Sequence, residues 1–197
     1  MSNRNKDSYI GSLTIKDYQI SMVDKLAEVF IGIPVQREWS AMTDARDLYC
    51  PRLDVVVGPF AIRKSRLESE YDQMMDDNRG LIDRLINLHN NNIQSLSWEI
   101  PATSWDKLKW TNRNARCFLA IEIENEVSRK HLIGGAVNAA ALGRIGIVVA
   151  WNRDKLKAFV KLRRYLNFLA SVGKNSFNTQ NLLILDPKQL TESLQTV

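Results

Sequence analysis

The chain has 197 residues, of which 45% are hydrophobic, and its 27 basic and 22 acidic residues give a net charge of +5. This length suits one domain or at most two small ones, and the apolar content supports a packed core, which excludes a disordered chain. No apolar run approaches the roughly 20 residues of a membrane helix, and residues 1–8 lack the apolar segment of a signal peptide, so we expect a cytoplasmic protein without membrane contact. The mild positive charge permits a nucleic-acid partner without requiring one.

The first third of the chain predicts one helix followed by two strands. Apolar residues recur at helical spacing over 14–30, and this helix is expected to end near Gly32. Residues 35–39 fit a short strand. Residues 53–57 read Leu-Asp-Val-Val-Val, which is typical of a strand with apolar neighbours on both faces.

A polar, helix-forming segment follows at residues 64–92, and Gly80 is expected to kink or split it. Residues 93–116 mix tryptophans with charges and predict no definite element. The remaining chain alternates strands and helices, with strands at 118–124, 145–150 and 181–185 and helices at 129–142 and 154–172. Ser128 and Gly143 are the expected caps of the first of these helices.

This order of elements predicts one α/β domain over residues 1–197. The strand–helix–strand unit over 118–150 should be a right-handed parallel crossover. We expect the core of the domain at about 15–150, a helical insert within it at about 64–92, and a C-terminal helix and strand at 154–186.

Two acidic residues, Asp54 and Glu122, lie on strands that otherwise consist of apolar residues. Two buried carboxylates in proximity repel each other, so one takes up a proton unless a cation lies between them. Mg²⁺ or Mn²⁺, which prefer oxygen ligands, would fill that role. Glu124 shares a strand face with Glu122 because side chains alternate along a strand. The competing interpretation is an exposed edge strand with a solvated acidic face, with Asp54 paired to an arginine.

The sequence Pro51-Arg-Leu-Asp54, followed by Glu122-Ile-Glu124 at a strand end and then a helix and a strand, resembles the PD-(D/E)xK nuclease superfamily. The core of that family is α-β-β-β-α-β, and the predicted elements between residues 15 and 150 follow this order. The resemblance implies the restriction-endonuclease-like fold, a central mixed β-sheet flanked by helices. It also implies a magnesium-dependent endodeoxyribonuclease of the restriction type, which acts on DNA as a homodimer.

In that family the aspartate and the first acid of the motif bind Mg²⁺, and the lysine supports the attacking water. By position, Asp54 and Glu122 would be ligands of Mg²⁺ or Mn²⁺, and Glu124 stands where the lysine belongs and would be a third ligand. Some members carry the lysine on the following helix, which makes Lys130 the candidate for the missing positive charge. Glu28 on the first helix is an additional candidate ligand, since some members use a helix glutamate there.

Three basic clusters are candidates for DNA contacts: Lys157, Lys161 and Arg164; Lys107, Lys109, Arg113 and Arg116; and Arg63, Lys64 and Arg66. The absent motif lysine leaves a second interpretation open, a nuclease-fold protein without catalysis that serves as a DNA-binding or assembly module. A third is an enzyme for small phosphorylated molecules, although the sequence contains no G-x-x-x-x-G-K-[ST] or G-x-G-x-x-G motif.

Overall fold

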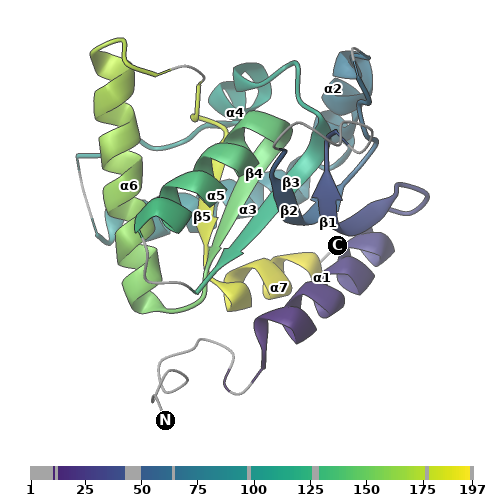
Figure 1. Ribbon diagram of the computed structural model, residues 1–197, viewed down its shortest axis with the longest axis horizontal. Helices are drawn as coiled ribbons and strands as arrows, with labels where there is room; N and C mark the ends of the chain where they lie inside the picture. The colour runs from purple at the N-terminus through teal and green to yellow at the C-terminus, as the bar shows by residue number, and fades with distance from the viewer. Residues whose placement is uncertain are drawn as a thin grey trace.

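The computed structural model describes residues 11, 13–42, 50–63, 65–96, 99–125, 129–175 and 178–195. Its centre is a five-stranded mixed sheet that carries helices on both faces (Figure 1). The strands, which lie in the sheet in chain order, are β1 (Val35–Ser40), β2 (Arg52–Val57), β3 (Cys117–Glu124), β4 (Gly143–Ala150) and β5 (Leu182–Leu185). The β1–β2 and β2–β3 pairs are antiparallel, and β3–β4 and β4–β5 are parallel. The predicted α/β class with a mixed sheet is confirmed.

Each face of the sheet has its own apolar core. The helices are α1 (Ile15–Val29), α2 (Glu68–Asp77), α3 (Arg79–Gln94), α4 (Trp105–Thr111), α5 (Arg129–Leu142), α6 (Arg153–Ser171) and α7 (Pro187–Gln195). Side chains of α1, α2, α3 and α7 pack with Ile121 and Ile147, whereas α5 and α6 pack on the other face with Ala120 and Val148. Over the residues that the structure describes, none of these helices is long and apolar enough to cross a membrane.

The helix α5 lies unusually close to the sheet because both surfaces carry small residues. Every residue of β4 is buried, and a Cβ atom built on Gly146 would lie 2.7 Å from the carbonyl carbon of Ala139. Gly143 follows α5 directly but already belongs to β4, where an added Cβ would lie 2.7 Å from Ala120 Cβ. The expected role of Gly143 as a helix cap is therefore replaced by a role in the close pairing of β3 and β4.

Two helices, α4 and α7, were not predicted from the sequence. Pro187 opens α7, the backbone N–H of Gln189 donates to Asp186 Oδ1 (2.8 Å), and Asp186 N–H donates to Gln189 Oε1 (2.9 Å). This is a capping box with proline at the first helical position, and Asp186-Pro-Lys-Gln189 is its signal in the sequence. The expected split of the long helical segment is present, and Asn78 separates α2 from α3. Ser128, the expected cap of α5, lies outside the described residues.

Candidate active site

Three acidic residues lie side by side across β1, β2 and β3. The β1–β2 register pairs Arg37 with Val55 and Trp39 with Leu53, so Glu38, between these pairs, takes the position opposite Asp54. The β2–β3 register, continued by one residue beyond its Val55–Ile121 pair, places Glu122 on the other side of Asp54. Residues opposite each other in antiparallel strands have neighbouring side chains, so the sheet gathers carboxyl groups that are far apart in the sequence.

The position of the Asp54 carboxylate is fixed from two sides. The backbone pairing of β2 with β3 stops at Val55, and beyond it the N–H of Ile123 donates to Asp54 Oδ2 (2.7 Å). From α1, the nearly buried Gln19 donates through Nε2 to Asp54 Oδ1 (2.9 Å). Both oxygens are thus held by a backbone group and by an amide, each of which stabilises the ionised form.

Glu38 is a member of this acidic group that the sequence did not reveal. It has a positive φ of 51°, a conformation that costs free energy for a residue other than glycine and that occurs often at functional sites. Its charge raises the pKa of both Asp54 and Glu122, so its carboxylate lies near theirs. Glu38 also forms a long ion pair with Arg52 (4.0 Å), in which both side chains are largely exposed.

Asp54 and Glu122 have strongly shifted pKa values. Burial raises the pKa of Asp54 to about 6, and the negative charges of Glu38 and Glu124 contribute to this rise. Burial and the charges of Asp54, Glu124 and Glu38 raise the pKa of Glu122 to about 9, and the two carboxyl groups are joined by a hydrogen bond. Near neutral pH, Glu122 is therefore protonated, and its carboxyl group donates a hydrogen bond to the ionised Asp54. Within the described part of the chain, the charged groups that shift these two pKa values are all acids, and the proton of Glu122 reduces the repulsion that a bound cation would otherwise offset.

The structure brings together three of the predicted site residues, Asp54, Glu122 and Glu124. Glu124 is the last residue of β3, two positions after Glu122, and it is close enough to raise both pKa values. Gly135 of α5 lies over Glu122, since a Cβ atom at this position would be 3.6 Å from Glu122 Cβ. This is an ordinary van der Waals distance, so α5 packs directly against the Glu122 side chain.

The other predicted site residues are placed differently. Glu28 is exposed, and it follows Gln19 by nine residues, which on a helix of 3.6 residues per turn is about half a turn around the axis. The α1 residue that reaches Asp54 is therefore Gln19, and the structure does not bring Glu28 to the acids. Lys130 is exposed in the first turn of α5.

The acidic group has the donor chemistry of a Mg²⁺ or Mn²⁺ site. Within the described residues, no three His, Cys, Asp or Glu side chains are placed to hold a metal ion as they stand. Mg²⁺, however, is bound in many enzymes by one or two protein carboxylates, with waters and substrate phosphates as the remaining ligands. The hydrogen-bonded pair of Asp54 and Glu122 fits that pattern, and an ion between them would take the place of the shared proton.

The interpretation of residues 118–124 as an exposed edge strand is wrong. The strand β3 is third of five and its residues from Cys117 to Ile121 are buried. Asp54 accepts hydrogen bonds from Gln19 and from the Ile123 backbone, and no arginine pairs with it among the residues that the structure describes. The acids at this point of the sheet therefore need a different explanation from that of a solvated strand face.

The basic cluster at residues 107–116 is largely engaged within the fold. Lys109 pairs with Asp76 of α2 (2.6 Å), and Arg113 pairs with Glu68 and Asp72, also of α2. Arg116 donates hydrogen bonds to the carbonyl oxygens of Ala61 and Ser65. Lys64 of a second cluster lies outside the described residues. The basic residues of α6 are thus the clearest remaining candidates for contacts with an anionic partner.

Comparisons of the chain with protein-family models, with curated proteins and with solved structures give no match. A functional assignment therefore depends on the order of the elements, on the acidic group around Asp54 and Glu122, and on the distribution of charge over the described surface.

Proposed function

We propose that the protein is a Mg²⁺- or Mn²⁺-dependent endodeoxyribonuclease of the PD-(D/E)xK type, which hydrolyses phosphodiester bonds of DNA. The observation that carries the proposal is the hydrogen-bonded pair of Asp54 and Glu122, with pKa values of about 6 and 9, at the point where β2 and β3 stop pairing. Carboxyl groups with such shifts are concentrated at functional sites. The order from α1 through β1, β2 and β3 to α5 and β4 supports the assignment.

Each residue of the acidic group has a separate role in this proposal. Asp54 and Glu122 hold the ion through carboxylate oxygens, and Glu124 at the end of β3 supplies a third oxygen ligand. Gln19 is a positioning residue, because its amide fixes one oxygen of Asp54 and leaves the other to the Ile123 backbone. When bound, the ion lowers the pKa of a coordinated water and polarises the phosphate.

The transition state of phosphate hydrolysis also needs a positive charge, which the motif lysine provides in the family. We assign this role to Lys130, which is exposed at the start of α5. Lys155 is a second candidate, because it is only 8% exposed in the first turn of α6, close in sequence to the end of β4 where Ala150 pairs with Glu124. No hydrogen bond or ion pair of its ammonium group occurs within the described ranges.

A cleavage assay on supercoiled plasmid and on large phage DNA, which offers many sequences, tests the proposal. We expect nicking or cutting with Mg²⁺ or Mn²⁺ and none with a chelator. Asp54→Asn and Glu122→Gln should each lower the rate by roughly 100-fold or more, since each removes an oxygen ligand. Lys130→Ala and Lys155→Met should identify the cation by a loss of about 10- to 100-fold in one of them.

The matched control is Glu28→Gln, which neutralises an exposed acid on α1 and should leave cleavage unchanged. Cleavage that persists in Glu122→Gln would contradict the site assignment. Folded wild-type protein that binds DNA in a salt-dependent way but never cuts it would favour the second function, a DNA-binding or assembly module. That alternative is supported by one observation, the glutamate at position 124 in the place of the motif lysine.

A further inference from the structure

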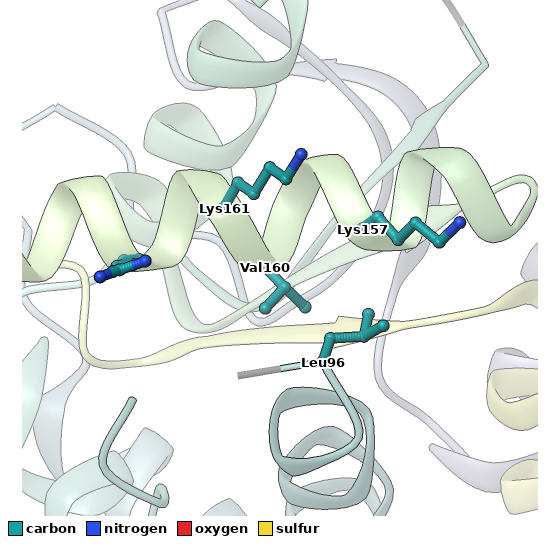
Figure 2. Close-up of a pocket in the computed structure, with 5 residues that line it drawn as sticks. Leu96, Lys157, Val160 and Lys161 are labelled. Carbon is teal, nitrogen blue, oxygen red and sulfur yellow. The ribbon is translucent and has the colours of Figure 1, made fainter. Parts of the chain in front are cut away.

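The helix α6 carries three basic residues, Lys157, Lys161 and Arg164, that line a pocket together with Leu96 and Val160 (Figure 2). The pocket has a volume of about 280 Å³ and is lined by Leu96, Lys157, Val160, Lys161 and Arg164. Four of these residues come from α6, and Leu96 follows the end of α3. Figure 2 shows Val160 directed toward Leu96, with Lys157 extending along the helix and Lys161 extending from its opposite side. The pocket is thus lined by two apolar and three basic residues.

The cations of this pocket are weakly held by the protein itself. Lys157 is 3.6 Å from Asp154, whose side chain is 87% exposed, and Arg164 pairs with the partly exposed Glu99. Lys161 forms no ion pair in the part of the chain that the structure describes. Ion pairs at such exposed positions contribute only about 0–1 kcal/mol, so a phosphate group can readily replace the carboxylates.

Aromatic side chains extend the same surface. Tyr165 and Phe168 are 50% and 56% exposed on α6. Tyr165 and Lys161 also line a second pocket, between α5 and α6, with a volume of about 480 Å³. Basic side chains interleaved with exposed aromatic rings are typical of surfaces that follow a nucleic-acid strand, where the charges contact phosphates and the rings contact bases or sugars.

The basic surface begins near the acidic site. The helix α6 starts at Arg153, three residues after Ala150, whose partner in the sheet is Glu124. With a rise of 1.5 Å per residue, the segment from Lys157 to Arg164 covers about 10 Å of the helix axis, directed away from that end of the sheet. A nucleic-acid strand bound along α6 would therefore run toward the end of the sheet where the acidic residues lie.

We propose that Lys157, Lys161 and Arg164, here called the α6 basic stripe, bind the phosphate backbone of DNA beside the bond that is cleaved. The position beside the cleaved bond rests on the proposed function, whereas the contact with DNA itself needs neither the metal ion nor Glu122. The three cations attract phosphates through charge, and Leu96, which is 36% exposed, provides an apolar contact for a sugar or a base. Binding at the stripe is independent of base sequence and weakens as the salt concentration rises.

Fluorescence anisotropy with a labelled duplex of about 30 base pairs tests the stripe, with a single strand of the same length as a second probe. The measurements are made in chelator on the Glu122→Gln background, so that cleavage does not interfere. We expect Lys157→Ala with Lys161→Ala to weaken binding by about tenfold or more near 100 mM salt. The same pair should lower the slope of log affinity against log salt by about 2, one phosphate contact for each lysine.

The matched control is Lys16→Ala with Lys188→Ala, which removes two exposed lysines from α1 and α7 and should change affinity less than about twofold. Circular dichroism and the melting temperature establish that both double variants are folded. The proposed role of the α6 basic stripe would be contradicted if the two double variants lowered DNA affinity equally, or if the Glu122→Gln protein bound no DNA. If the wild-type protein binds DNA through the stripe but never cleaves it, the proposed DNA contact is supported and the nuclease function is contradicted.

Discussion

Glu122 has a larger pKa shift than Asp54. Its pKa rises from an ordinary value of 4.5 to about 9 in the folded protein, mainly through burial and through the charge of Asp54. An acid whose pKa is higher in the folded state favours folding only while it is protonated. Its contribution is thus complete below about pH 4.5 and is lost as the pH rises through about 9.

Replacing the carboxyl group by an amide should remove this pH-dependent loss of stability. We expect Glu122→Gln to stabilise the metal-free protein near pH 9 by on the order of 2 kcal/mol and to flatten the decline in stability between about pH 5 and pH 9. Urea unfolding in chelator at several pH values measures both effects. The exposed Glu28→Gln serves as the control and should change stability by less than about 0.5 kcal/mol. A wild-type stability that does not fall over this range would show that Glu122 is not a buried, protonated acid.

At the residue scale, the sequence revealed those acids that stand out from their neighbours. Asp54 and Glu122 are conspicuous because apolar residues surround them on strands, whereas Glu38 and Gln19 look like ordinary solvated residues. The role of Glu38 depends on the β1–β2 register, and that of Gln19 on which face of α1 is buried. Glu28 was suggested by the family resemblance, but the apolar face of α1 turns it toward solvent.

At the scale of elements, the packing of α5 on β4 holds the helix above Glu122. Gly146→Ala would place a Cβ atom 2.7 Å from the backbone of Ala139, so α5 must move. We expect a loss of roughly 2–3 kcal/mol in stability and slower cleavage, because Gly135 of the same helix lies against Glu122. Thermal unfolding and the plasmid assay measure the two effects.

Gly134→Ala is the comparison for this substitution. A Cβ atom there meets nothing within 4 Å, so the change should stabilise the protein by up to about 1 kcal/mol through helix propensity. If Gly146→Ala were as stable as Gly134→Ala, the close approach of α5 to β4 would be disproved.

The strands and long helices follow from their apolar patterns, and the missed elements have local causes. The helix α7 was not predicted, although it begins at Pro187 and proline is favoured at the first position of a helix. The seven-residue α4 lies in a segment rich in tryptophan and charge, where the spacing of apolar residues gives no clear period. Its cap, Ser104, accepts a hydrogen bond from Lys107 N–H (3.3 Å).

At the scale of the whole molecule, the fold places the acidic site and the α6 basic stripe on different elements. Acids gather where β1, β2 and β3 meet, and the α6 basic stripe begins beyond the end of the neighbouring β4. A sequence pattern predicts the two groups separately, but their relation depends on the order of strands and on the β2–β3 pairing across the insert of α2, α3 and α4. Long-range pairing of this kind is set by tertiary packing, which local propensity does not encode.

The most direct test of the account is a calorimetric titration of Mn²⁺ into the protein near pH 7.5, in two buffers with different enthalpies of ionisation. If the ion binds between Asp54 and Glu122, it displaces the proton of Glu122, so binding should release about one proton per ion. Asp54→Asn and Glu122→Gln should both abolish this binding, and Glu28→Gln should preserve it. Binding without proton release, or equal binding by the Glu122→Gln variant, would contradict the assignment of these two carboxyl groups as the metal site.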